Sequence, residues 1–166
     1  MPDHTTIPIP VVRTMIRPSL GRRLLFTFSD DMDPKVLGER VLDPVFICAA
    51  RIESRRFAIN EDGRATILPR ANHCIHGAVY EVDDCGMTCL GLWLGVPSVH
   101  DRFGALARNG DGRLVLVEYH GTRNPNLGRA EPGYLRTIVD AARSHGFPAE
   151  YIEELERCNT VPRSVG

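Results

Sequence analysis

The chain has 166 residues, of which 20 are basic and 21 acidic, and 43% of its residues are apolar. This length and composition support one globular domain with a full hydrophobic core. The net charge of −1 provides no overall positive field, so we expect no nucleic-acid partner and no membrane partner. The arginine clusters at 22–23 and 51–56 are mixed with acidic residues and are interpreted as solvated surface.

The sequence also carries information on the compartment. No apolar run is long enough to cross a bilayer, and the first residues lack the basic flank and apolar core of a secretory signal. The five cysteines show no compact framework spacing, which favours a reducing compartment over a disulfide scaffold. We therefore expect a cytoplasmic protein.

The first elements follow a proline-rich start. Residues 1–21 contain four prolines and no sustained period, which indicates an extended leader. The apolar and aromatic residues 24–28 then predict a buried strand that ends in the turn 29–31. Pro34 suits the first turn of a short helix that we expect to run through Arg40.

The middle of the chain has mainly strand patterns. We expect a strand over 45–59, a turn at 60–63 in which Gly63 takes a positive φ, and a paired strand over 65–68. Residues 73–82 alternate and are rich in β-branched and aromatic side chains, which predicts a further strand. Asp83 and Asp84 then provide caps for a helix through Leu92.

The last third begins with a hairpin and ends with helices. The turn sequence at 109–112 joins expected strands at 102–107 and 114–119. Apolar residues recur at helical spacing over 134–142, and a second helix is expected over 149–157. Strands followed by helices predict an α+β fold with a largely antiparallel sheet or barrel and flanking helices. The expected organisation is a leader at 1–21, one domain at 22–158 and a tail at 159–166.

Two groups of residues resemble a known family. The C-terminal group matches a P-x-Y-L-x-x-I-x-x-G-A-x-x-x-G-L-P-x-x-Y signature through Pro132, Tyr134, Leu135, Ile138, Ala141, Ala142, Gly146, Phe147, Pro148, Tyr151 and, beyond it, Leu155. The upstream group resembles a V-x-G-x-x-Y-x-L strand through Ile75, Gly77, Val79, Tyr80 and Val82, after a hairpin at 56–68. Over residues 24–156 this order resembles the γ-glutamylcyclotransferase-like (AIG2-like) family, which implies that family's fold and its barrel cavity.

The resemblance also marks positions of the family's binding loop. In the family a Y-G-S-N loop offers backbone N–H groups to the glutamyl carboxylate of the substrate. The matching residues here are Phe28, Ser29, Asp30 and Asp31, followed by the expected Met32. The carboxylates of Asp30 and Asp31 would repel the carboxylate of the family's substrate in this loop. We therefore expect weaker carboxylate binding and a cationic or amide-bearing ligand.

The family's general acid/base is missing from its expected place. The L-D-x-x-E-G-V motif, whose glutamate takes a proton from the attacking α-amino group, reads L-G-L-W-L-G-V at 90–96. Leu94 therefore replaces the glutamate and has no proton to exchange, and general acid–base catalysis contributes about 10²- to 10⁴-fold in rate. A shared fold alone does not imply that this chain has the family's activity.

Other groups are candidates to replace that glutamate. His100 lies near a family tyrosine and titrates near neutrality if it faces the cavity, whereas the alternative is a histidine at a surface or hairpin edge. Asp30 and Asp31 lie at the expected cavity mouth. Glu118 and Tyr119 lie on the last strand, and only one of them is expected to face the cavity.

Histidines and cysteines in the middle of the chain raise the hypothesis of a zinc-binding or redox-responsive protein. His73 and His76 are three residues apart on an expected strand and would point to opposite faces, which argues against zinc. Cys85 and Cys89 have helical spacing and are interpreted as buried small hydrophobes. No metal and no cofactor are expected.

Two further residues are weaker candidates for a site. Cys74 is the only cysteine with neighbouring bases in the sequence, which is a weak signal for a nucleophile. Trp93, next to Leu92 and Leu94, is interpreted as an apolar anchor, with stacking on a ligand as the alternative.

Two functions remain open at this point. The first is a diverged member of the family that binds a small amino-acid-like or amide metabolite, with altered lyase, hydrolase or transferase chemistry. The second is a catalytically inactive pseudoenzyme that acts as a ligand-binding or interaction module. In both, the expected partner is a small molecule, and the sequence does not predict the oligomeric state.

Overall fold

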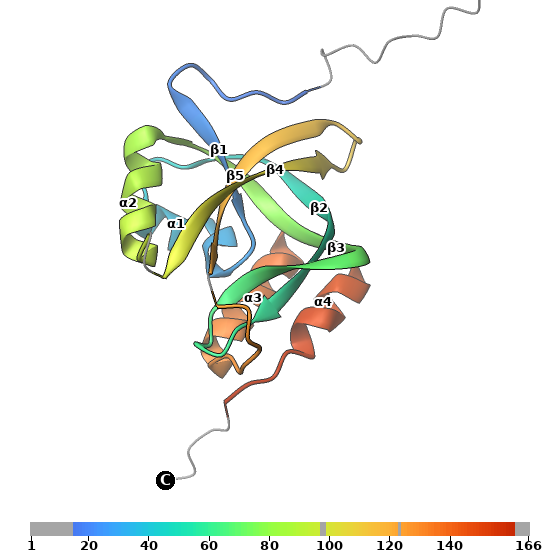
Figure 1. The fold of residues 1–166 in the computed structure, drawn as a ribbon. Helices are drawn as coiled ribbons and strands as arrows, with labels where there is room; N and C mark the ends of the chain where they lie inside the picture. The colour runs from blue at the N-terminus through green and yellow to red at the C-terminus, as the bar shows by residue number, and fades with distance from the viewer. Residues whose placement is uncertain (1–14, 97–98, 123, 162–166) are drawn as a thin grey trace, which may run out of the picture.

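The computed structural model describes residues 15–96, 99–122 and 124–161. Five strands form a closed barrel in the order β1-β3-β2-β4-β5, with α1 and α2 on one side and α3 and α4 at one end (Figure 1). This architecture confirms the α+β class and the barrel with flanking helices that the sequence predicted. In the described part of the chain, no helix is long and apolar enough to cross a membrane.

Strand β1 leads into the loop that the sequence marked. β1 covers Arg22–Thr27 and pairs antiparallel with β3 over its whole length. A single 3₁₀ turn at Asp30–Met32 follows, and then helix α1 at Pro34–Arg40. The side chain of Asp33 accepts a hydrogen bond from the Lys35 amide at 2.8 Å, which caps α1 and fixes where the loop ends.

The sequence predicted two short strands where the structure has one long strand. β2 covers Val45–Ile59, as expected, but β3 runs without a break over Ala65–Asp83, so the separation at 69–72 was wrong. The β2–β3 register shifts between Glu53 and Arg55, and Asn72 has a positive φ of 61°. This irregularity bends the hairpin without ending it. One half closes the barrel, and the other half contacts the C-terminal helices.

Gly77 allows β1 and β3 to approach closely. A Cβ atom at this position would lie 2.4 Å from the Thr27 carbonyl oxygen and 2.5 Å from the Phe26 ring. Only glycine therefore fits where the Phe26 ring crosses β3. The glycine of the V-x-G-x-x-Y-x-L motif has a packing role directly beneath the loop at 28–32.

The barrel closes through β4 (His100–Asn109) and β5 (Leu114–Thr122). They form an antiparallel hairpin, and β5 meets β1 in a parallel contact at Leu25 and Glu118. Residues 1–14 of the expected leader lie outside the described residues. Within its remaining part, Ile16 bridges to Val115 and its amide donates to the Leu114 carbonyl at 2.9 Å. This end of the leader therefore packs on the barrel.

The helices cover the barrel with their apolar faces. α2 (Asp84–Leu94) begins at Asp83, whose side chain accepts from the Gly86 amide, and ends at Gly95 with φ 79°. α3 (Pro132–Ser144) and α4 (Ala149–Glu156) confirm the two predicted C-terminal helices. The Tyr134 hydroxyl of α3 accepts from the Ala65 amide, and the Tyr151 hydroxyl of α4 donates to the His76 carbonyl, so both helices are tied to β3.

Candidate functional site

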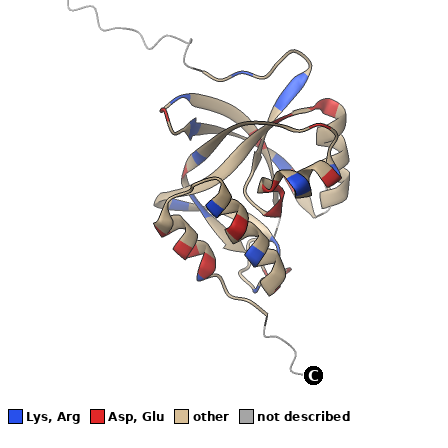
Figure 2. Cartoon of the chain, turned by 180° about the vertical axis from the view of Figure 1, so that it is seen from behind, with Lys and Arg blue, Asp and Glu red and all other residues tan. Residues whose placement is uncertain are grey.

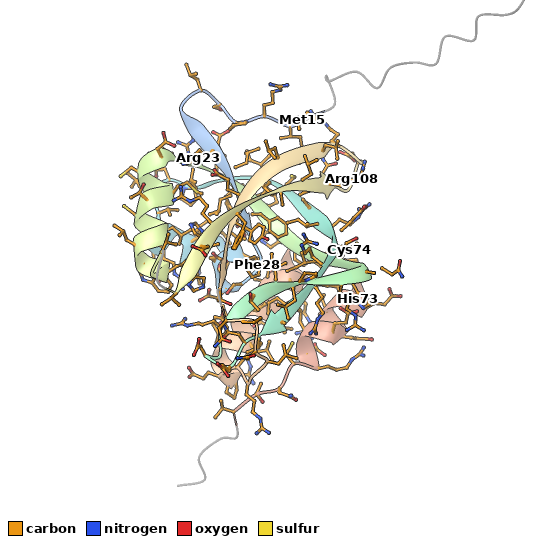
Figure 3. The ribbon with its side chains drawn as sticks, viewed as in Figure 1. Met15, Arg23, Phe28, His73, Cys74 and Arg108 are labelled. Atoms are coloured by element: carbon orange, nitrogen blue, oxygen red, sulfur yellow. The ribbon has the colours of Figure 1, made fainter. Side chains whose placement is uncertain are left out.

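A small cavity lies where the loop after β1 meets α2 and the β4–β5 hairpin. We call it the loop cavity, and its volume is about 30 Å³. The residues around it come from every part of the chain: Leu25, Phe26, Phe28, Ser29, Asp30, Asp31, Arg40, Arg64, Ala65, Trp93, Leu94, His100, His120 and Tyr134. The cavity therefore collects Phe28, Ser29, Asp30, Asp31, Leu94 and His100, which the sequence had marked as candidates from separate motifs. Figure 3 shows the side chain of Phe28 in the middle of the barrel.

Asp30 does not present a free charge to this cavity. Its two carboxylate oxygens accept from the two terminal nitrogens of Arg40 at 3.0 and 2.7 Å. This bidentate geometry is the strong form of a carboxylate–guanidinium pair. One of the two negative charges predicted at the cavity mouth is therefore neutralised within the protein.

Asp31 is the most unusual ionisable group of the site. Its side chain is 9% exposed, and its Oδ1 atom has no hydrogen-bond partner among the described residues. Burial, and next the neighbouring charge of Asp30, raise the pKa of Asp31 to about 7, while Arg40 acts in the opposite direction. Near neutral pH the carboxyl group is therefore able to take up and release a proton.

A tyrosine from the C-terminal motif holds the loop. The Tyr134 hydroxyl lies 2.7 Å from the Ser29 hydroxyl and accepts from the Ala65 amide at 3.1 Å. Because that amide occupies one acceptor position of the oxygen, the phenol can donate to Ser29. Burial raises the pKa of Tyr134 first of all, so its hydroxyl remains protonated at neutral pH. α3 thus fixes the β1 loop to the start of β3.

Two neutral histidines line the opposite wall. His100 Nδ1 donates to the Leu94 carbonyl at 2.6 Å, and the side chain is only 6% exposed, so the alternative of a surface histidine is wrong. His120 lies on the same face, is 5% exposed, and has an Nε2 atom with no partner among the described residues. Burial lowers the pKa of His100 and, together with Arg102, lowers that of His120 to about 4. Both imidazoles are uncharged at pH 7.

Sequence reasoning missed His120. A signal was present, because residues two apart on a strand share a face, and His120 is two residues from Glu118, which was a candidate. The β4–β5 pairing places His120 opposite Arg102 and next to His100 along the face. Only this register brings the two histidines together.

The rim of the cavity is cationic and aromatic. The guanidinium carbon of Arg40 lies 3.8 Å from the centre of the Trp93 ring, which is the geometry of a cation–π contact. Trp93 is 54% exposed, so its interpretation as a buried apolar anchor was wrong. Arg64 is exposed on the other side of the rim and has no ion-pair partner among the described residues.

Three candidate residues lie outside the cavity wall. Met32 is fully buried, and its carbonyl accepts from the Tyr80 hydroxyl and from His145 Nε2, each at 2.8 Å. Glu118 pairs with Arg23, with the Nε–Oε2 distance at 2.7 Å. Tyr119 stacks on Phe103 and touches Phe28 edge-on. Their positions suit support of the loop and the strands more than contact with a ligand.

The cysteine and histidine candidates do not form a metal centre. In the residues that the structure describes, no group of three or more His, Cys, Asp or Glu side chains is arranged to hold an ion. Cys85 and Cys89 are both exposed, so their interpretation as buried hydrophobes was wrong. The opposite face of α2, with Met87 and Leu90, is the one that packs on the barrel.

Comparisons with known proteins show what this chain is similar to. Residues 74–155, close to half of the chain, match the model of the AIG2-like family. A solved structure of a gamma-glutamyl cyclotransferase superposes with a TM-score of 0.80 at 19% identity, covering 87% of this chain and 92% of that one. The chain therefore resembles the AIG2-like family over residues 74–155 and has the γ-glutamylcyclotransferase-like fold.

Other solved structures show the same fold. An uncharacterized human protein has a TM-score of 0.80 at 19% identity, covering 88% of this chain and 93% of that one. A yeast gamma-glutamyl cyclotransferase specific to glutathione has a TM-score of 0.53 at 12% identity, covering 81% and 94%. At these identities the likeness to these structures establishes the fold only. No curated protein matches the sequence.

Proposed function

We propose that this AIG2-like protein binds a small amino-acid-like or amide metabolite in the loop cavity and that Asp31 moves the proton during its conversion. The observation that carries the proposal is the buried, unpartnered Oδ1 of Asp31, on a carboxyl group whose pKa is about 7. A general base works best when its pKa lies near the operating pH. Asp31 meets this condition in a cavity that Leu94 also lines.

The chemistry would follow the cyclotransferase type of reaction. An amine of the substrate attacks the carbonyl carbon of its own amide, so that a ring C–N bond forms. The Asp31 carboxylate takes a proton from the attacking nitrogen and returns one to the departing amine as the original amide C–N bond breaks. Ser29, His100 and Tyr134 offer neutral polar groups near this carboxyl group for orienting the amide.

The charges around the cavity fit an amino-acid-like ligand. Asp30 is paired with Arg40, and Asp31 is about half protonated at pH 7, so the repulsion expected from two aspartates is largely absent. An amine would pair with Asp31. Arg64 at the rim would pair with a carboxylate, because its guanidinium carries no other ion pair among the described residues.

The ligand must open the cavity to enter. A volume of about 30 Å³ holds little more than a water molecule. Trp93 and Arg40 lie at the rim, and Trp93 is half exposed, so their contact is the part of the wall that can separate most readily. Substrate binding would therefore change the surroundings of the indole ring.

Trp93 is the only tryptophan of the chain, so its fluorescence reports on this cavity directly. The test is a titration with γ-glutamyl amines, glutamine-like amides, ureas and cationic amino acids. We expect at least one class to shift the emission in a saturable way, and Asp31→Asn to weaken that binding about tenfold or more. Asp111→Asn, an exposed aspartate of the β4–β5 turn, is the matched control. No saturable shift with any class would reject the proposal.

An inactive binding module is the second candidate, and Leu94 is the observation that favours it. Its apolar side chain lines the cavity, and the resemblance implies that the family has a glutamate at this position. Binding without product from the natural protein, together with 5-oxoproline release from γ-glutamyl amines by Leu94→Glu, would establish this candidate. All five cysteines are free, which fits the reducing, cytoplasmic setting that remains part of either proposal.

A further inference from the structure

A second and larger hollow is lined by residues that do not belong to the loop after β1. It has a volume of about 420 Å³, which is in the range of small-molecule sites. We call it the arginine groove, because Arg56 of β2, Arg70 of β3 and Arg157 after α4 all line it. His73 lies on the same side, and Figure 3 shows it on β3 toward α4. The loop cavity shares none of these residues.

The charges of the groove are mostly uncompensated. Neither Arg56 nor Arg70 has an ion pair or a side-chain hydrogen bond in the described part of the chain, and Arg157 has only a 3.6 Å contact with Glu153. Figure 2 shows that α4 itself carries acidic residues, but of these only Glu154 lines the groove. Among the residues that line the groove, three arginines therefore stand against one glutamate.

The arginines of the groove come from separate elements. Arg56 of β2 and Arg157, which follows α4, line it together with Cys158. Side chains from elements far apart in the sequence therefore meet at one groove. The arginine cluster at 51–56 was interpreted from the sequence as solvated surface, and for Arg56 this was incomplete.

Backbone hydrogen bonds hold the walls of the groove. The Gly128 amide donates to the Ile59 carbonyl at 3.0 Å, and the Ala130 amide donates to the Asn159 carbonyl at 2.9 Å. A Cβ atom on Gly128 would lie 2.4 Å from the Asn60 carbonyl oxygen, so only glycine lets this segment lie flat against the end of β2. The groove is thus formed before any ligand arrives, which lowers the cost of binding.

We propose that the arginine groove binds a small molecule that carries two or more phosphate groups. A guanidinium group can donate two parallel hydrogen bonds to the oxygens of one phosphate group. Three arginines can therefore bind more than one phosphate group. The exposed side chain of Leu127 is the main apolar surface, whereas Phe57 and Ile59 are nearly covered. No exposed aromatic ring lines the groove for stacking a base, so a compact polyphosphate suits it better than a nucleobase.

Calorimetric titration of the full chain with inorganic pyrophosphate and tripolyphosphate at low ionic strength tests this proposal. We expect saturable binding of one molecule per chain, weakened about tenfold or more by Arg56→Ala and by Arg70→Ala. Arg136→Ala removes an exposed charge of α3 outside the groove and is expected to change the affinity less than twofold. Thermal melting of each variant verifies its fold.

Three results would overturn the proposal. The first is no binding by the natural protein up to millimolar pyrophosphate and tripolyphosphate. The second is an equal loss of affinity in Arg56→Ala and Arg136→Ala, which would show a diffuse charge effect. The third is binding of citrate as tightly as tripolyphosphate, which would show that the groove does not select phosphate groups.

Discussion

The carboxyl group of Asp31 and the side chain of Leu94 line the same cavity, although they come from the loop after β1 and the last turn of α2. The Leu94 side chain is apolar, while the buried carboxyl group of Asp31, with a pKa near 7, faces the same space. The cavity wall therefore combines one apolar side chain with one acidic group.

The elevated pKa of Asp31 predicts how stability depends on pH. The folded state holds a proton on Asp31 up to about pH 7, whereas the unfolded state releases it near the ordinary aspartate pKa of 3.8. Between these values the folded state binds more protons, so stability falls as pH rises and levels off above pH 7. We expect Asp31→Asn to remove this loss. The free energy of unfolding of the variant, relative to that of the natural protein, should therefore rise by about 2–3 kcal/mol from pH 5 to pH 8.

Urea unfolding at several pH values measures this difference directly. Asp111→Asn is the control, because that aspartate is exposed in the turn between β4 and β5. A constant difference between Asp31→Asn and the natural protein over this range would show that Asp31 titrates as an ordinary aspartate.

Arg40 is predicted to set the ionisation of Asp31. Its positive charge lowers the pKa of Asp31, so Arg40→Ala should move that pKa above about 7 and shift the stability loss to higher pH. Carboxyl-carbon NMR of labelled aspartates follows the titration. Arg143→Ala, which removes ion pairs with Asp140 and Glu156, provides the comparison. An unchanged Asp31 titration in Arg40→Ala would contradict the assigned electrostatics.

Tyr134 and Tyr151 offer a matched pair of substitutions. Tyr134→Phe removes the hydroxyl contacts with Ser29 and the Ala65 amide, whereas Tyr151→Phe removes a 3.3 Å bond to the His76 carbonyl outside the loop cavity. We expect each to cost about 1–2 kcal/mol of stability. Only Tyr134→Phe should weaken ligand binding as measured by Trp93 fluorescence, and equal binding by both variants would remove Tyr134 from the site.

Gly77 tests the packing beneath the loop. Gly77→Ala would place a methyl group 2.4 Å from the Thr27 carbonyl oxygen, and we expect a loss of about 3 kcal/mol or more. Gly38→Ala on α1 meets no atom within 4 Å and should stabilise the protein by about 1 kcal/mol. Thermal melting compares the two, and a Gly77→Ala variant as stable as the natural protein would refute the steric argument.

Much of the fold was predictable from local signals. Strand β2, helix α1 and the turns with Gly63 and Gly112 follow from alternation, caps and residues that accept positive φ. The continuity of β3 was not predictable, because the register shift at Ser54 and the turn-like Asn72 depend on pairing with β2. The residues at 69–72 have the composition of a loop, and it is pairing with β2 that keeps this segment within the strand.

The candidate site was also predictable only where a local motif marks it. The loop residues Ser29 to Asp31 and Leu94 were found through a motif order that survives in this chain. His120 and Arg64 carry no motif, and they reach the cavity only through the β4–β5 register and the β2–β3 hairpin. The pairing of Asp30 with Arg40 changed the expected electrostatics, because a sequence shows two negative charges and not their partners.

The most direct test of this account is the release of 5-oxoproline from γ-glutamyl amines between pH 5 and pH 9, by the natural protein and by Asp31→Asn. We predict release whose rate rises as Asp31 ionises around pH 7, and a loss of about 100-fold or more in Asp31→Asn. Equal rates for the two proteins, or no release by the natural protein at any pH, would contradict the assignment of Asp31 as the proton carrier.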